Sequence, residues 1–292
     1  LLGGGLSLEG ISRNHKFTYL IGARQKSTQY LLSTLDTKGD YKPVFYDVQG
    51  LLTYDVSNKT SISLLGNFSK SKYNITPQTR TTDIDTVSQA LRLTVYFDGQ
   101  EVDDFTTTTG AVTLSHSPNQ SLNLKLIGSV FTTSEEETFD ILGQYFLDEL
   151  EKDPASKNFG EVKLNLGVGS FLNHARNYLE GKVYAAEHKG TYSYRNNELL
   201  WGLRFQHEQF NDKINEWNYI DSAGYSLPHP ADSVGGSFPS QPQLLLQDVM
   251  NRKNALSSNR ISGYVQHNFY FSKTSRFTLT PGVRFTWWSL NK

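Results

Sequence analysis

The chain has 292 residues, which allows two soluble domains of average size or a single all-β unit. Lys and Arg total 28 and Asp and Glu total 29, so the net charge of -1 gives no electrostatic basis for binding nucleic acid. The chain has no cysteine, which excludes a disulfide scaffold, a Cys-ligated metal site and a cysteine nucleophile.

The composition is aromatic and polar at once, with 17 Phe, 16 Tyr and 4 Trp beside a charged fraction of 20%. Such a mixture suits β-strands that have one apolar and one wet face. A helical membrane span needs about 20 consecutive apolar residues, and the sequence has no such stretch. Helical spans are therefore excluded, and the first residues carry no readable signal peptide.

Four runs of about ten residues alternate between apolar and polar side chains, as β-strands with two different faces do. They cover residues 60–69, 121–130, 199–208 and 277–287. In the second run, Leu122, Leu124 and Leu126 share one side, and Asn123 and Lys125 point to the other. About ten tilted residues are enough for a strand to cross a bilayer core.

Tight polar turns are widely spaced along the chain. They are expected at 11–14, 57–59, 117–120, 195–197 and 272–275, roughly 46 to 78 residues apart. Two ten-residue strands fill only part of each interval, leaving long loops at 25–43, 74–108, 134–175 and 221–258. Short turns alternating with long loops are typical of outer-membrane barrels. The sequence therefore predicts an all-β, antiparallel transmembrane β-barrel with about ten strands and long extracellular loops.

One of these loops, 134–175, is predicted to contain a short helix. Apolar residues recur there at intervals of three and four, at Phe139, Leu142, Phe146 and Leu150. Residues 134–137 (SEEE) offer a capping box, and Asp153-Pro154 would end the helix.

Two local signals modify the strand pattern. Asp98-Gly99 follows an alternating run and predicts a hairpin turn, hence a β-ribbon above the membrane. Pro281 lies inside the last predicted strand, where a proline removes a ladder hydrogen bond. A local bulge there would remove the conflict.

Ten strands in one sheet leave two unpaired edges, which cannot persist in lipid. We therefore expect residues 1–292 to form a partial barrel that belongs to a larger one or pairs with other strands.

No catalytic motif is complete, so the sequence predicts no enzyme, no cofactor and no metal site. Residues 207–211 (HEQFN) begin like a zinc-protease motif but have Asn211 in place of the second His. Gly167-Val168-Gly169 has Leu172 where a dinucleotide-binding loop needs its third Gly. Glu135, Glu136 and Glu137 could supply oxygen ligands to a cation, but a solvated helix start is the favoured interpretation.

Two groups of aromatic residues are candidates for function. One group lies near predicted strand ends and is interpreted as membrane-interface aromatics, with core packing as the alternative: Tyr46, Tyr54, Phe285, Trp287 and Trp288. The other group flanks an outer loop and could contact a ligand or simply pack within the loop: Trp217, Tyr219 and Tyr225.

Five stretches in series resemble the barrel of TonB-dependent outer-membrane receptors. They are 90–105 (ALRLTVYFDGQEVDDF), 139–150 (FDILGQYFLDEL), 174–184 (HARNYLEGKVY), 216–228 (EWNYIDSAGYSLP) and 280–285 (TPGVRF). The similarity extends over most of the chain. The resemblance rests on the five stretches occurring in this order, since no single short motif is diagnostic.

The resemblance implies a 22-stranded barrel in the outer membrane of a Gram-negative bacterium, closed by an N-terminal plug and energised through a periplasmic TonB protein. It also implies uptake of a scarce nutrient such as a metal chelate, vitamin, glycan or peptide. The partners are then outer-membrane lipid, TonB through the plug region and an unknown small nutrient. No plug, TonB box or signal peptide is visible in residues 1–292, so we expect an interior part of the barrel.

Two other classes remain open on the sequence. A passive porin or adhesion barrel shares every membrane feature, and only the resemblance separates it from a receptor. A soluble all-β glycan-binding module would use exposed aromatic rings to stack on sugars.

Overall fold

In the computed structural model, the chain forms one antiparallel β-sheet. The structure describes residues 3–27, 39–85, 89–221, 246–270 and 277–290. The strands are β1 (Gly3–Ile11), β2 (Phe17–Ser27), β3 (Gly39–Tyr41), β4 (Val44–Ser57), β5 (Thr60–Pro77), β6 (Arg80–Asp85), β7 (Ala90–Asn119), β8 (Leu122–Leu150), β9 (Val162–Tyr194), β10 (Asn197–Asp221), β11 (Leu246–Tyr270), β12 (Thr278–Leu279) and β13 (Gly282–Leu290).

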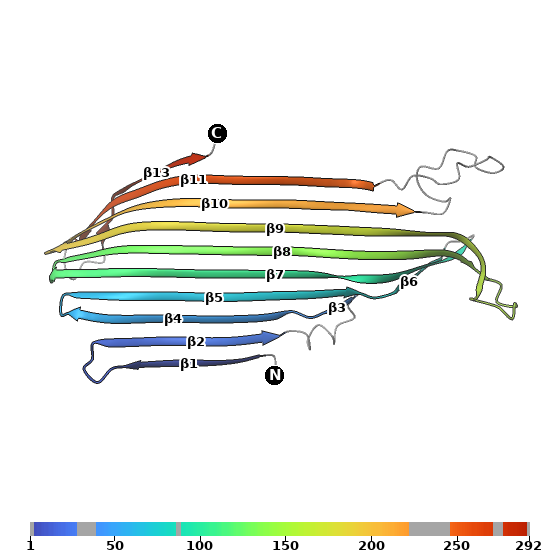
Figure 1. The fold of residues 1–292 in the computed structure, drawn as a ribbon, viewed down its shortest axis with the longest axis horizontal. Helices are drawn as coiled ribbons and strands as arrows, with labels where there is room; N and C mark the ends of the chain where they lie inside the picture. The colour runs from blue at the N-terminus through green and yellow to red at the C-terminus, as the bar shows by residue number, and fades with distance from the viewer. Residues whose placement is uncertain (1–2, 28–38, 86–88, 222–245, 271–276, 291–292) are drawn as a thin grey trace.

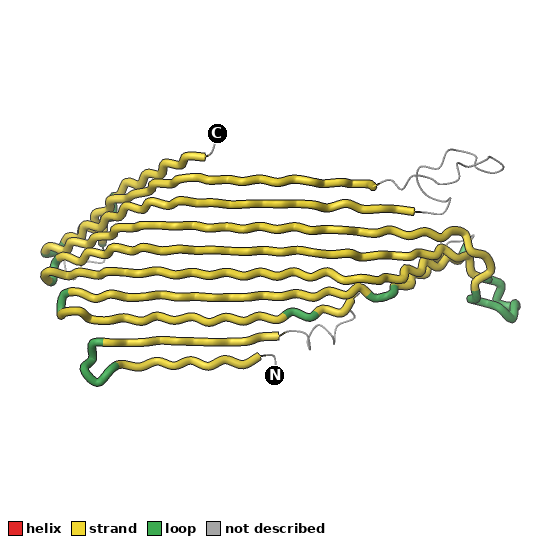
Figure 2. The backbone as a smooth tube through the Cα atoms, in the orientation of Figure 1, coloured by secondary structure: helices red, strands yellow, loops and turns green. Residues whose placement is uncertain are grey.

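Sequential strands lie side by side (Figures 1 and 2), in the order β1-β2-β4-β5-β7-β8-β9-β10-β11-β12, and β13 continues beside β11. The short strands β3 and β6 pair with β5 and β7. Counting the interrupted β12/β13 once, the sheet has ten strand positions, as the sequence predicts. Among the described strands, β1 pairs only with β2 and β13 only with β11, so the sheet is open at both edges.

The tight turns lie together at one end of the sheet, on the left in Figure 1, which we call the short-turn end. Side chains of Ser12, Asn14 and Asn119 stabilise two of these turns by accepting backbone hydrogen bonds: Phe17 N donates to Ser12 Oγ, Lys16 N to Asn14 Oδ1, and Ser121 N to Asn119 Oδ1. Such side-chain acceptors are why Ser and Asn favour turns. The predicted turn at 272–275 lies outside the described residues.

The strands extend well beyond the short turns, so most predicted loops are shorter than expected. β8 and β9 are 29 and 33 residues long, and residues 151–161 alone connect them. The predicted loop 221–258 is also shortened, because β11 begins at Leu246.

The predicted helix at 139–150 is wrong: these residues form the last part of β8. Both faces of β8 carry apolar side chains there, which mimics a helical spacing. Neighbouring strands hold the segment extended on both sides, since Phe146 lies opposite Thr94 of β7 and Val168 of β9. Its ring also meets that of Tyr96 edge to face, with centroids 5.7 Å apart.

The Asp98-Gly99 hairpin is also wrong, because both residues lie inside β7 and pair with Leu142 and Ile141 of β8. Gly99 has a positive φ of 99° but does not reverse the chain. A β-ribbon does exist, formed by β6 and β7.

Pro281 does not interrupt a strand interior, because it lies in the break between β12 and β13. Its carbonyl oxygen accepts a hydrogen bond from His267 N at 2.9 Å. The proline therefore lies at a position where no backbone N–H has to donate a hydrogen bond to a neighbouring strand.

The sheet is a single layer among the described residues. Leu150 and Ala175 are the only buried hydrophobic residues there, while Leu126 and Val265 are 56% and 54% exposed. None of the described residues forms a helix that has the length and apolar character of a membrane span.

Candidate functional site

The two faces of the sheet differ in chemistry. Residues opposite one another in adjacent antiparallel strands point to the same side, so the register assigns each residue to a face. Leu64, Val112 and Gly128 lie on one side, which we call the apolar face. Ser61, Ser115 and Lys125 lie on the other side, which we call the polar face.

Next to the short turns, the apolar face carries a belt of mostly apolar side chains, interrupted by His188 of β9, which we call the apolar band. Each long strand contributes to it, for example Leu8, Ile21, Leu52, Leu64, Val112, Leu126, Tyr184, Leu203, Val265 and Phe285. On β8 the band runs from Leu122 to Val130. Beyond it, the same face becomes polar, as Thr132, Ser134 and Glu136 show on β8.

The far edge of the apolar band slopes across the sheet. Phe68, Thr108, Thr132, Lys182 and Gln209 lie opposite one another from β5 to β10. The last residue of the apolar band is Phe68 in β5, Val130 in β8 and Phe205 in β10. The edge at Phe68 of β5 is level with Gln209 of β10, but in β10 itself the edge lies at Phe205. The edge therefore moves by four residues over the four steps from β5 to β10. One residue per strand gives a strand tilt of about 35°, because residues rise by about 3.3 Å and strands lie about 4.8 Å apart.

Four of the five predicted interface aromatics lie on the apolar face. Tyr54 is at the short-turn side of the band and Tyr46 at its far edge, and Phe285 and Trp287 lie on β13. Trp288 lies on the polar face instead, where the guanidinium carbon of Arg260 is 4.8 Å from its ring centroid. The sequence did not single out Tyr184 and Phe205, which share the far edge; only the register reveals their common level.

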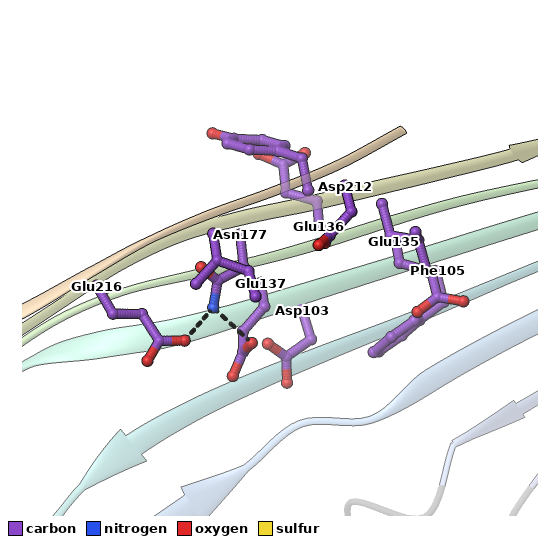
Figure 3. A pocket seen from close by; sticks show the side chains of 11 residues that line it. Asp103, Phe105, Glu135, Glu136, Glu137, Asn177, Asp212 and Glu216 are labelled. Atoms are coloured by element: carbon purple, nitrogen blue, oxygen red, sulfur yellow. Dashed lines mark hydrogen bonds between the residues drawn. The ribbon is translucent and has the colours of Figure 1, made fainter. Parts of the chain in front are cut away.

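Beyond the apolar band, the polar face carries an acidic pocket of about 430 Å³ (Figure 3). Asp103, Glu137 and Asn177 occupy it from β7, β8 and β9, because the register places them opposite one another. Asn177 Nδ2 donates hydrogen bonds to Glu137 Oε2 at 3.0 Å and to Glu216 Oε1 at 2.6 Å. No Lys or Arg is among the described residues that line the pocket.

Two carboxylates of this pocket and the neighbouring Glu101 lie close together. Glu101, Asp103 and Glu137 can each direct one oxygen so that all three lie within 4.8 Å of one another, a donor set that suits a hard cation. Partial burial, with the charges of Asp103 and Glu137, raises the pKa of Glu101. Partial burial and Glu137 likewise raise the pKa of Asp103, whose Oδ1 is buried and has no hydrogen-bond partner among the described residues.

We expect Asp103→Asn to stabilise the protein at pH 7. A carboxyl group whose pKa is higher in the folded than in the unfolded protein favours folding while it is protonated, below its ordinary pKa of about 4. That stabilisation is lost as the pH rises through the raised pKa. The gain in unfolding free energy should be about 0.5 kcal/mol, since the group stays largely solvated. Urea unfolding should show this gain at pH 7 and almost none at pH 4. Glu9→Gln, at an exposed position on β1, is the control; a loss of stability at pH 7 in Asp103→Asn would contradict the prediction.

Two of the three predicted ligand-contacting aromatics lie at the far end of β10. Trp217 and Tyr219 belong to β10, opposite His174 and Leu172 of β9, and Tyr225 lies outside the described residues. The Trp217 ring stacks on that of His174, with centroids 4.6 Å apart and planes 17° from parallel. One face of Trp217 is therefore covered from within the sheet.

His174 belongs to a small polar cluster with Asp140 and Arg176. His174 Nδ1 lies 2.6 Å from Asp140 Oδ1, and Arg176 donates to the other carboxylate oxygen and to the carbonyl of Phe139. Partial burial alone would raise the pKa of Asp140, but the hydrogen bonds from Arg176 and His174 lower it overall. Sequence reasoning missed this cluster, because Asp140 is 34 residues from His174 and 36 from Arg176 and meets them only through the β8–β9 register.

The fold and its faces define the chain as a large open antiparallel sheet with an apolar band on one face and an acidic pocket on the other. No protein-family model, curated protein or solved structure matches the chain.

Proposed function

We propose that the sheet is part of the wall of an outer-membrane β-barrel, and that this barrel belongs to a TonB-dependent receptor for the uptake of a scarce nutrient. The single observation that carries the membrane proposal is the apolar band. The receptor class rests on the resemblance of residues 90–105, 139–150, 174–184, 216–228 and 280–285 to such barrels.

The height of the apolar band supports a membrane location. On β8 the band from Leu122 to Val130 extends over about 26 Å of strand, or about 22 Å after a tilt of about 35°. The apolar belt of outer-membrane barrels is about 25 Å tall, and their strands tilt by about 35 to 45°. The band and slope of this sheet therefore match both quantities.

The chemistry of the faces gives the orientation. The apolar face would contact lipid, with aromatic rings such as Tyr46 and Tyr54 near the two headgroup levels. The polar face would line the water-filled interior. The short-turn end would be periplasmic and the long extensions of β7, β8 and β9 extracellular.

The open edges at β1 and β13 require partners in lipid, because exposed backbone donors and acceptors are costly there. We propose that further strands of the same barrel cover both edges. Energy would reach the barrel through a plug and a periplasmic TonB protein, so the chain works by binding and gating and uses no catalytic group.

Four tryptophans make the membrane proposal testable, since they sample different environments. Trp201 and Trp287 lie in the apolar band, Trp288 lies on the polar face, and Trp217 lies beyond the band. In single-tryptophan variants of the intact protein in vesicles, brominated lipid chains should quench Trp201 and Trp287 strongly. Trp288 and Trp217 should be quenched several-fold less.

Equal quenching at Trp287 and Trp288 would contradict the assignment of faces. Absence of quenching at all four sites, with a protein that stays dissolved without detergent, would favour the soluble glycan-binding module. Planar-bilayer conductance separates the two membrane classes: a receptor should stay closed without TonB, and a passive porin should conduct.

A further inference from the structure

Arginines converge on the polar face at the level of the apolar band. Arg204, Arg260 and Arg284 come from β10, β11 and β13 and line one pocket of about 580 Å³. We propose that these three arginines bind an oxyanion, a carboxylate or phosphate group of a small solute. The proposal deepens the proposed function, on which it rests, by naming an anionic nutrient as the substrate class.

The register explains why the three arginines line one pocket. Arg204 lies opposite Ser262, and Ser262 lies opposite Thr286 of β13. Arg260 precedes Ser262 by two residues, and Arg284 precedes Thr286 by two, so both side chains emerge on the same face as the two hydroxyls. An anion above Ser262 would have arginines on three sides and the hydroxyls of Ser262 and Thr286 below it.

The charges around this point are not balanced. Lys189 also lines the pocket, and Glu187 is the one carboxylate among the described lining residues. Glu187 is already engaged, with Oε1 at 3.0 Å from Lys189 Nζ. Arg260 pairs with Glu208, which lies outside the lining, but no ion pair among the described residues neutralises Arg204 or Arg284, so a negative group is needed beside these two.

Two arginine donors point to the same conclusion. The Nε atoms of Arg204 and Arg260 are buried and have no hydrogen-bond partner among the described residues. Buried donors are nearly always satisfied, and Nε together with one terminal nitrogen forms the fork that grips carboxylate or phosphate. Arg260 uses a terminal nitrogen on Glu208, at 3.3 Å from Oε1, and still leaves Nε open.

Trp288 provides a direct reporter, because it lies against Arg260. The experiment uses the intact protein in detergent micelles, with Trp201, Trp217 and Trp287 replaced by Phe. Sodium phosphate, and separately citrate, is titrated at constant ionic strength against sodium chloride, which removes general screening. We expect a saturable change in Trp288 fluorescence.

Arg204→Gln and Arg284→Gln should each weaken this binding about tenfold, since each removes a charge-assisted hydrogen-bond fork. Lys125→Gln is the matched control: it removes a cation from the same face outside this pocket, and the affinity should stay within about twofold. Arg204→Lys keeps the charge and loses the fork, so it should fall between the native protein and Arg204→Gln. Near-ultraviolet circular dichroism verifies that each variant is folded.

Three results would overturn the proposal: no saturable response to either anion, equal losses in Lys125→Gln and the arginine variants, or full affinity in Arg204→Gln and Arg284→Gln. These results are independent of lipid quenching at Trp287. Quenching at Trp287 without anion binding would reject the anion site alone, whereas loss of quenching would reject the membrane proposal.

Discussion

Leu126→Arg is expected to destabilise the membrane-inserted protein by about 2 to 4 kcal/mol, the cost of an arginine on the lipid face at the bilayer midplane. Leu126 lies midway between Leu122 and Val130 in the apolar band of β8, and its side chain is 56% exposed. The cost arises because a guanidinium group there must either lose its hydration or distort the bilayer. Urea unfolding in lipid vesicles measures it.

Ile127→Arg is the matched control, one residue further along the same strand. Ile127 lies on the polar face opposite Glu187 of β9, so the added charge meets water and a carboxylate. Its unfolding free energy should change by less than about 1 kcal/mol. If the two variants lose stability equally, or if Ile127→Arg is the more damaging, then the apolar face does not contact lipid.

Gly99→Ala is expected to destabilise the protein by about 2 to 3 kcal/mol, the scale of a strained backbone conformation. Gly99 has φ of 99°, which side chains other than glycine rarely adopt. A Cβ atom there would also lie 1.9 Å from the carbonyl oxygen of Asp140 in β8. The β7–β8 pairing would therefore have to open locally, and amide hydrogen exchange of residues 98–102 should accelerate.

Gly66→Ala is the control for the glycine substitution. Gly66 lies in the middle of β5 on the apolar face, and a Cβ atom there would have no neighbour within 4 Å. Alanine should be neutral or slightly stabilising, because it restricts the unfolded chain. A stability in Gly99→Ala equal to that in Gly66→Ala would show that β7 does not hold Gly99 in this conformation.

The failed helix at 139–150 shows where sequence patterns mislead in this chain. Apolar residues at intervals of three and four predict a helix only if the segment pairs with nothing else. Here β7 and β9 flank the segment on both sides, and its partners lie 12 (Leu150 and Val162) to 58 (Glu149 and Leu91) positions away in the sequence. Long-range pairing therefore overrides the local pattern.

Asp98-Gly99 failed for a related reason. The dipeptide favours a tight turn when the flanking strands pair with each other, yet both flanks of β7 pair with β8. The glycine keeps its unusual φ and the strand continues through it.

The sequence by itself determined the strands next to the short turns, because strict alternation fixes which side chains share a face and Ser, Asn and Gly specify the turns. It also determined the count of ten strand positions. Only the tertiary structure decided the register between strands, and register alone gathers Asp103, Glu137 and Asn177 into one pocket and the three arginines into another. The physical reason is that a period of two assigns a residue to a face, whereas its neighbours across the sheet depend on hydrogen bonds between distant segments.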